Sequence, residues 1–142
     1  MLATWRDLNA LRHLEQACFP LDAWTLFDHI GVLSFPSVVR LKAVDRDLMV
    51  GFIAGDQRGS KQLAWIATLG VLPKYRRQGI GRLLLESCEG ELSVPHIRLS
   101  VRSNNAPALT LYRQMGYQRV DIWPSYYHGG MDAVVLEKQR II

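Results

Sequence analysis

The stretch Leu63–Cys88, LAWIATLGVLPKYRRQGIGRLLLESC, decides how the rest of the chain is organised. Its first part, Leu63–Val71, is apolar and contains no proline, which predicts a buried strand. A proline and then a basic turn with two glycines follow. From Leu83 onward the apolar residues fall on one helical face, with Glu86 and Glu89 off that face. The stretch therefore predicts a strand, a basic turn and a helix, in that order.

The turn before this helix has the features of a phosphate-binding site. A helix start leaves four backbone N–H groups without partners and carries about half a positive charge. Gly79 and Gly81 have no Cβ, so a pyrophosphate can approach the backbone, and Arg76, Arg77 and Arg82 add positive charge. The simpler alternative is a tight turn in which the glycines serve only the backbone geometry.

The class of phosphate ligand is narrowed by what the sequence lacks. A dinucleotide motif needs a third glycine where Leu84 stands, and a Walker loop needs Lys-Ser or Lys-Thr after the glycines. The pattern that remains is [RQ]-x-x-G-x-[GA] after a strand, at Arg76–Gly81. It resembles the acyl-CoA pyrophosphate motif of the GNAT superfamily of N-acetyltransferases. This resemblance implies acetyl-CoA as the cosubstrate.

Length and composition limit the class of protein. With 142 residues, 49% of them hydrophobic, the chain fits one domain over 1–142. No apolar run reaches the roughly 18 residues of a membrane helix, and the N-terminus lacks signal-peptide features. Cys18 and Cys88 have no metal or redox spacing, so we expect reduced thiols, no metal and a cytoplasmic protein. The net charge of +4 is mostly scattered, which indicates neither nucleic acid nor membrane as partner; monomer and homodimer both remain open.

Helical and strand patterns alternate along the rest of the chain, which predicts the mixed α/β class. The GNAT resemblance implies a central mixed, mostly antiparallel sheet that is splayed between the strands Leu63–Val71 and His96–Val101, with helices on both faces. Further helices are expected at Thr4–Ala17, at Asp22–Val32 and between Asn105 and Gly116, and further strands at Ser37–Val44, Leu48–Gly55, Tyr117–Trp123 and Ala133–Lys138.

The family resemblance also implies where acetyl-CoA binds. In GNAT enzymes it lies in the splay, and its pantetheine arm pairs with the first of the two strands, here near Leu69 and Val71. The pyrophosphate lies on the amides from Arg77 to Arg82, and Asn105 matches a position that contacts the CoA arm. The cofactor-binding residues implied in this way are Leu69, Val71, Arg76, Arg77, Gln78, Gly79, Ile80, Gly81, Arg82, Asn105 and Tyr112.

Other segments resemble a narrower group, the protein N-terminal acetyltransferases, including the bacterial ribosomal-protein alanine acetyltransferases. These segments are Leu99–Tyr112, Gly116-Tyr117, Phe19-Pro20-Leu21, Trp65–Val71 and Tyr126-Tyr127. The resemblance implies an amine acceptor, a protein or peptide N-terminus, bound by Phe19, Leu21, Trp65, Tyr126 and Tyr127. Two alternatives are acetylation of a small-molecule amine, such as a polyamine or aminoglycoside, and a non-catalytic acyl-CoA sensor.

The resemblance assigns the acid but leaves the base open. It implies that Tyr112, protonated at neutral pH, donates to the CoA sulfur, and that the Val71 N–H stabilises the oxyanion. Where the subgroup carries Glu or His this chain has Ser100, and where some members carry Tyr it has Trp65; neither side chain is a general base near neutral pH. We favour a proton relay through water and Ser100. Alternatively, His128 or Tyr126 reaches the amine and accepts its proton, or the site lacks a base and is catalytically weak.

Overall fold

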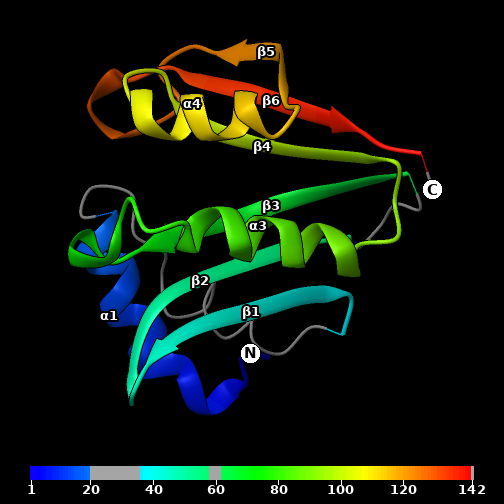
Figure 1. Ribbon diagram of the computed structural model, residues 1–142. Helices are drawn as coiled ribbons and strands as arrows, with labels where there is room; N and C mark the ends of the chain where they lie inside the picture. The colour runs from blue at the N-terminus through cyan, green and yellow to red at the C-terminus, as the bar shows by residue number, and fades with distance from the viewer. Residues whose placement is uncertain (20–35, 58–61, 142) are drawn as a thin grey trace.

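The computed structural model describes residues 1–19, 36–57 and 62–141. Its sheet has six strands, β1 Val38–Asp45, β2 Leu48–Asp56, β3 Leu63–Val71, β4 His96–Arg102, β5 Gln118–Trp123 and β6 Ala133–Gln139. Their order is β1-β2-β3-β4-β6-β5, and within the described residues β3 and β4 are the one parallel pair (Figure 1). The predicted mixed, mostly antiparallel sheet is confirmed.

The helices differ in detail from those expected. The described helices are η1 Trp5–Asp7, α1 Leu8–Cys18, η2 Pro73–Tyr75, α3 Ile80–Glu91, α4 Ala106–Gln114 and η3 His128–Gly130. The expected first helix is divided because Asp7 binds the Thr4 N–H and the Lys42 ammonium, at 2.8 and 2.9 Å, and gives α1 no side-chain cap. The helix expected at Asp22–Val32 lies outside the described residues.

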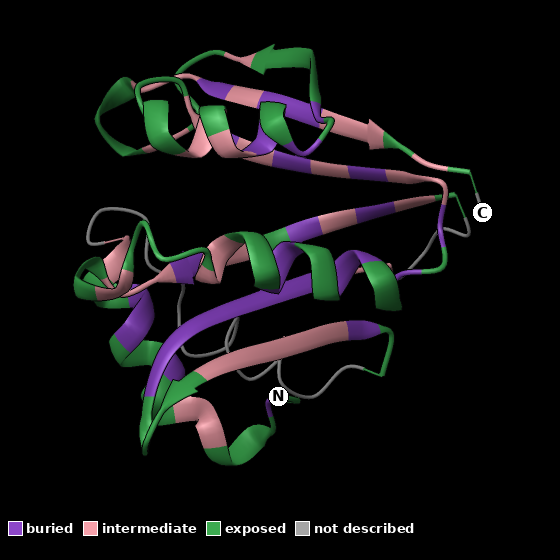
Figure 2. Ribbon diagram, in the orientation of Figure 1, coloured by how far each residue is buried: buried purple, intermediate pink, exposed green. Residues whose placement is uncertain are grey.

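Helices α1 and α3 cover opposite faces of the sheet, as predicted (Figure 1). Strand β2 is buried between them, because its residues alternate between the two faces. Phe52 packs in one core cluster with Leu11 of α1. On the other face a Cβ on Gly55 would lie 2.8 Å from the Cys88 sulfur of α3, so glycine is needed there for the helix to approach. Figure 2 shows β2 as an almost continuous buried ribbon.

The second half of the sheet, β4, β6 and β5, is covered on one face by α4 (Figure 1). Leu99 and Leu136 from the strands join Tyr112 and Met115 from the α4 region in the same core cluster as α3. None of the helices described is both long and apolar enough to cross a membrane.

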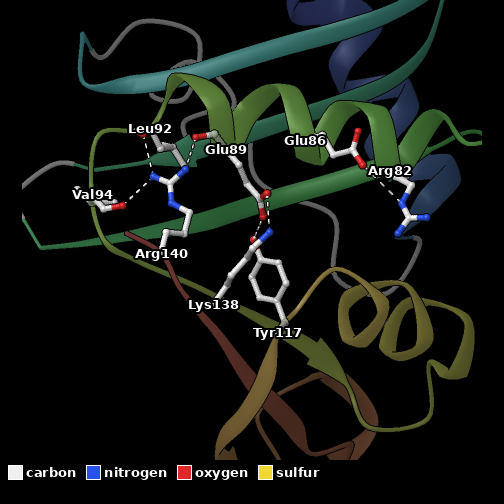
Figure 3. Close-up of polar contacts among 8 residues, drawn as sticks. All are labelled: Arg82, Glu86, Glu89, Leu92, Val94, Tyr117, Lys138 and Arg140. Atoms are coloured by element: carbon white, nitrogen blue, oxygen red, sulfur yellow. Dashed lines mark hydrogen bonds and ion pairs between the residues drawn. The ribbon is translucent and has the colours of Figure 1, made fainter. Parts of the chain in front are cut away.

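A buried polar clamp joins the C-terminal part of α3 to this second half of the sheet (Figure 3). The Glu89 carboxylate is 7% exposed and accepts hydrogen bonds from the Tyr117 hydroxyl at 2.7 Å and the Lys138 ammonium at 3.0 Å. Arg140 donates to the carbonyl of Glu89 in the last turn of the helix and to those of Leu92 and Val94 after it. Glu89 is therefore buried, although the helical pattern placed it off the apolar face.

Removing the carboxylate from this clamp is expected to destabilise the fold. Glu89→Ala should lower the free energy of unfolding by about 3–5 kcal/mol, because it leaves the Lys138 ammonium partly buried and unpaired. Urea denaturation followed by circular dichroism measures the change. Glu86→Ala is the matched control on the same helix, because Glu86 only meets the exposed Arg82 at 3.6 Å and should contribute no more than about 0.5 kcal/mol. Equal losses in the two variants would contradict the clamp.

Candidate active site

The site is built on the edge of β3 that, among the described residues, pairs with no strand after Trp65. β3 pairs with β4 only from Leu63 to Trp65, and Figure 1 shows the two ribbons diverging beyond that point. The Leu72 N–H bonds to β2, and hydrogen-bonding direction alternates along a strand. The N–H and C=O groups of Leu69 and Val71 therefore point away from β2, toward the open edge. This is the direction that the predicted pairing with a pantetheine arm requires.

The turn after β3 leads directly into α3 and leaves space at its glycines. Gly79 is the N-cap residue, with φ of +82°, and a Cβ there would have nothing within 4 Å. α3 begins at Ile80 and not at Leu83, so Gly81 belongs to its first turn. A Cβ on Gly81 would point between β3 and α4, 3.8 Å from both Val71 and Leu111. Arg77, Gln78 and Arg82 are exposed around the same turn.

Two side chains fix the carbonyl at the end of β3. Arg76 Nε donates to the Val71 carbonyl at 2.9 Å, and the Cys18 thiol of α1 donates to the same oxygen at 3.3 Å. Arg76 therefore holds the turn against the strand in addition to adding charge. Both cysteines are free, and burial raises the pKa of each thiol, to about 12 for Cys88.

Tyr112 extends from α4 into the core beside β4. Its side chain is 8% exposed and belongs to the core cluster that contains Leu99 and Val101 of β4. Burial, and secondarily the nearby phenol of Tyr127, raise the pKa of Tyr112 above the usual value of 10. Tyr112 is therefore protonated throughout the neutral range. Asn105 caps α4, because its side-chain oxygen accepts the Ala108 N–H at 3.2 Å.

The opposite face of β4 carries polar side chains. Leu99 and Val101 point into the core, so Ser100 between them points to the other face. The Ser100 and Tyr127 hydroxyls lie 3.0 Å apart, and either can donate the hydrogen bond. The Arg102 guanidinium lies over the Tyr127 ring, 5.2 Å from its centre. The strand thus separates Tyr112 on one face from a second set of hydroxyls on the other.

A row of four aromatic rings extends from this second face. Trp65 lies 5.7 Å from Trp123, Trp123 lies 5.0 Å from Tyr126, and Tyr126 lies 5.0 Å from Tyr127, centre to centre. Tyr126 is 58% exposed. Trp65, Tyr126 and Tyr127, all predicted to bind the acceptor, are therefore brought together. Trp123 was missed, because a tryptophan at the end of an edge strand belongs to no motif.

Of the two remaining predicted acceptor residues, the structure describes Phe19. Phe19 follows α1 and packs on β3, where a Cβ on Gly70 would be 3.3 Å from its ring. Leu21 lies outside the described residues, and its role stays a prediction.

Sequence reasoning also missed Glu15, which is 1% exposed and accepts a hydrogen bond from the Thr68 hydroxyl at 2.9 Å. In the sequence, the only indication that Glu15 is buried is its position on the apolar face of the predicted first helix. In the described residues no three His, Cys, Asp or Glu side chains are grouped to hold a metal ion.

Comparisons with known proteins agree with this geometry. N-alpha-acetyltransferase 50 of Danio rerio is 30% identical over 143 residues, which cover 95% of this chain and 84% of that protein. The [Ribosomal protein bS18]-alanine N-acetyltransferase of Salmonella typhimurium is 31% identical over 138 residues, which cover 92% and 89%. Matches to two archaeal N-alpha-acetyltransferases span about half of those proteins, 46% and 45%.

A structural comparison and a family model point to the same class of protein as these sequence matches. The crystal structure of the ribosomal-protein-S18-alanine N-acetyltransferase from Escherichia coli superimposes with a TM-score of 0.90 at 26% identity, covering 100% of this chain and 93% of that one. Residues 6–117 match the model of the acetyltransferase (GNAT) family. The chain therefore belongs to the GNAT family of acetyl-CoA-dependent N-acetyltransferases.

Proposed function

We propose that this chain transfers the acetyl group of acetyl-CoA to the α-amino group of a protein N-terminus. One observation carries the proposal. The unpaired edge of β3 lies between two chemically different surfaces, a buried acid beside a glycine-containing helix start on one face and a row of hydroxyls and aromatic rings on the other. Such an edge can hold a thioester where an amine reaches it from the opposite side.

The residues around the edge fit acetyl-CoA. The first amides of α3 and the open space at Gly79 suit a pyrophosphate, and Arg77 and Arg82 supply exposed positive charge. Gly81 leaves room between β3 and α4 for the arm that follows. The outward-directed N–H and C=O groups of Leu69 and the Val71 N–H suit the amides of a pantetheine chain, whereas the Val71 carbonyl already accepts hydrogen bonds from Arg76 and Cys18.

Acetyl-CoA provides the thioester, and groups of this chain provide a proton donor and a hydrogen bond for the oxyanion. Tyr112 keeps its proton at neutral pH, because burial raises its pKa, and this suits it to protonate the leaving sulfur. The Val71 N–H points to the open edge, where an oxyanion develops during attack by the amine. Arg76 and Cys18 hold the carbonyl of the same residue, so the main chain is fixed before the substrates arrive.

The acceptor surface favours a peptide over a polycationic small molecule. Its described groups include four aromatic rings and the Ser100 hydroxyl, with the Arg102 guanidinium over Tyr127 and the Asp121 carboxylate on the Trp123 N–H at 3.2 Å. Glu137 on the neighbouring strand is held by Arg98 at 2.7 Å, so its charge is already compensated. An aromatic wall with hydrogen-bonding hydroxyls suits a peptide with an apolar first residue.

An acceptor panel tests this function directly. The purified chain is given acetyl-CoA with a peptide library that varies in the first residue, a polyamine or an aminoglycoside, and free thiol is measured. We expect thiol release with peptides that carry a free α-amino group and none with N-terminally blocked copies. Turnover confined to the polyamine or the aminoglycoside would overturn the peptide assignment.

Filling the space at Gly81 should block the cosubstrate. Gly81→Val places two methyl groups between β3 and α4, and overpacking of about 1–3 kcal/mol corresponds to about a tenfold to hundredfold rise in the Kd of coenzyme A. Isothermal titration calorimetry measures it. Gly90→Val is the matched control, because Gly90 lies on the same helix and a Cβ there meets nothing within 4 Å. If both variants bind coenzyme A like the parent, the predicted binding path is wrong.

Removing the acid should affect turnover and leave binding intact. Tyr112→Phe keeps the buried ring and deletes the proton donor, so kcat should fall by about 10²–10⁴-fold. The Kd of acetyl-CoA should stay the same, because the ring continues to fill the core. Steady-state kinetics with a peptide acceptor and calorimetry distinguish the two quantities. An unchanged kcat under conditions where chemistry limits the rate would remove Tyr112 from the mechanism.

A further inference from the structure

A buried carboxylate, Glu15 of α1, contacts β3 directly. It is 1% exposed, and its Oε1 accepts a hydrogen bond from the Thr68 hydroxyl at 2.9 Å. Glu15 lies in the last turn of α1, where the helix dipole disfavours a negative charge. Burying a carboxylate also costs free energy that an apolar side chain at the same position would not cost. Packing alone therefore does not account for a carboxylate at this position.

A bulge in β3 places Thr68 on the same face of the sheet as Trp65. Trp65 lies opposite Asp56 of β2. Thr68 lies opposite Ala54, so three steps along β3 match two along β2, and Ala67 is the extra residue. Residues two apart on β2 point to the same face, as do the residues opposite them. This is the face that α1 covers, because Ala54 packs in the same core cluster as residues of α1.

Ser100 points to this face as well. Trp65 pairs with β4 two residues before Ser100, so the two side chains share one face. The bulge residue Ala67 is exposed although β3 lies in the middle of the sheet, and Thr68 is half-buried. Thr68 is followed by Leu69, whose N–H and C=O groups point to the open edge. Under the proposed function, the Thr68 hydroxyl is therefore next to the place where the amine meets the thioester.

We propose that Thr68 and Glu15 together take the proton that the acceptor amine loses. This inference rests on the proposed function and supplies the base that Ser100 and Trp65 do not. The Thr68 hydroxyl donates to Glu15, which leaves the lone pairs of its oxygen to accept the amine N–H. Thr68 touches the amine, and Glu15 is a positioning residue that acts through it. The buried negative charge also stabilises the positive charge that the nitrogen gains during attack.

The step balances in atoms and charge. The neutral amine attacks, the carbon–nitrogen bond forms and the carbon–sulfur bond breaks, with no oxidation or reduction. The amine proton passes to the Thr68 oxygen as the Thr68 proton passes to Glu15, while Tyr112 protonates the departing sulfur. Between turnovers Glu15 releases one proton to the solvent and Tyr112 takes one up, so both return to their starting states.

The first test is Glu15→Gln in the full chain with acetyl-CoA and a peptide acceptor. Glutamine keeps the volume and the oxygen that accepts the Thr68 hydrogen bond, and it removes the charge and the proton affinity. We expect kcat to fall by about 10²-fold. The KM for the peptide and the Kd of acetyl-CoA should stay close to those of the parent. A merely structural role would be retained by glutamine and would leave kcat unchanged.

Variants of Thr68 test the hydroxyl itself. Thr68→Val keeps the shape and removes the hydroxyl, so it should lower kcat about as much as Glu15→Gln. Thr68→Ser keeps the hydroxyl and should retain most of the activity. Because both residues act on one proton path, the double variant Glu15→Gln with Thr68→Val should lose no more than the worse single variant.

Glu89→Gln is the matched control, because Glu89 is also a buried carboxylate with a hydroxyl partner, Tyr117. It should keep the kcat of the parent at a temperature where circular dichroism shows both glutamine variants folded. Equal losses of kcat in Glu15→Gln and Glu89→Gln, or the parent's kcat in Glu15→Gln or Thr68→Val, would overturn the inference and leave acetyl transfer intact. Coenzyme A binding by the parent without turnover of any amine would overturn the proposed function.

Discussion

The loss of pairing between β3 and β4 is the constraint on which the rest of the structure depends. Two parallel strands in the middle of a sheet normally share backbone hydrogen bonds along their whole length, because unpaired buried N–H and C=O groups cost free energy. Here the pairing covers three residue pairs and then stops. Under the proposed function these backbone groups pair with the cosubstrate, which gives the interruption of the sheet a role in binding.

Such an interruption weakens the middle of the molecule, and α3 compensates for it. The N-terminal end of the helix forms part of the proposed phosphate site, while its C-terminal part is fixed to the far half of the sheet through Glu89, Tyr117 and Lys138. Arg140 adds three hydrogen bonds to carbonyls at and after the helix end, where a cation also interacts favourably with the helix dipole. One helix thus offers its N-terminal end to the proposed site and joins the two halves of the sheet through its C-terminal end.

The sequence predicts features that depend on neighbouring residues, such as strand bounds and helix caps. It does not predict contacts between residues that are far apart in the chain. The bounds of Leu63–Val71 and the start of α4 at Asn105 were readable, because apolar runs and caps act within a few residues. The burial of Glu89 was not, since its partners lie 28 and 49 residues away. Alternation along β4 placed Ser100 opposite the core, but the Tyr127 contact depends on a loop that positive φ angles at Ser125, Gly129 and Gly130 shape.

The short β3–β4 contact has a consequence for how the chain folds. β1, β2 and β3 follow one another in sequence and in space, and β4, β5 and β6 form the other half in the order β4-β6-β5, so the strands of each half come from one continuous part of the chain. Contacts between nearby residues form faster than contacts that close long loops. We expect each half to become ordered on its own timescale. The docking of the two halves along the boundary between β3 and β4 is then the late and cooperative step.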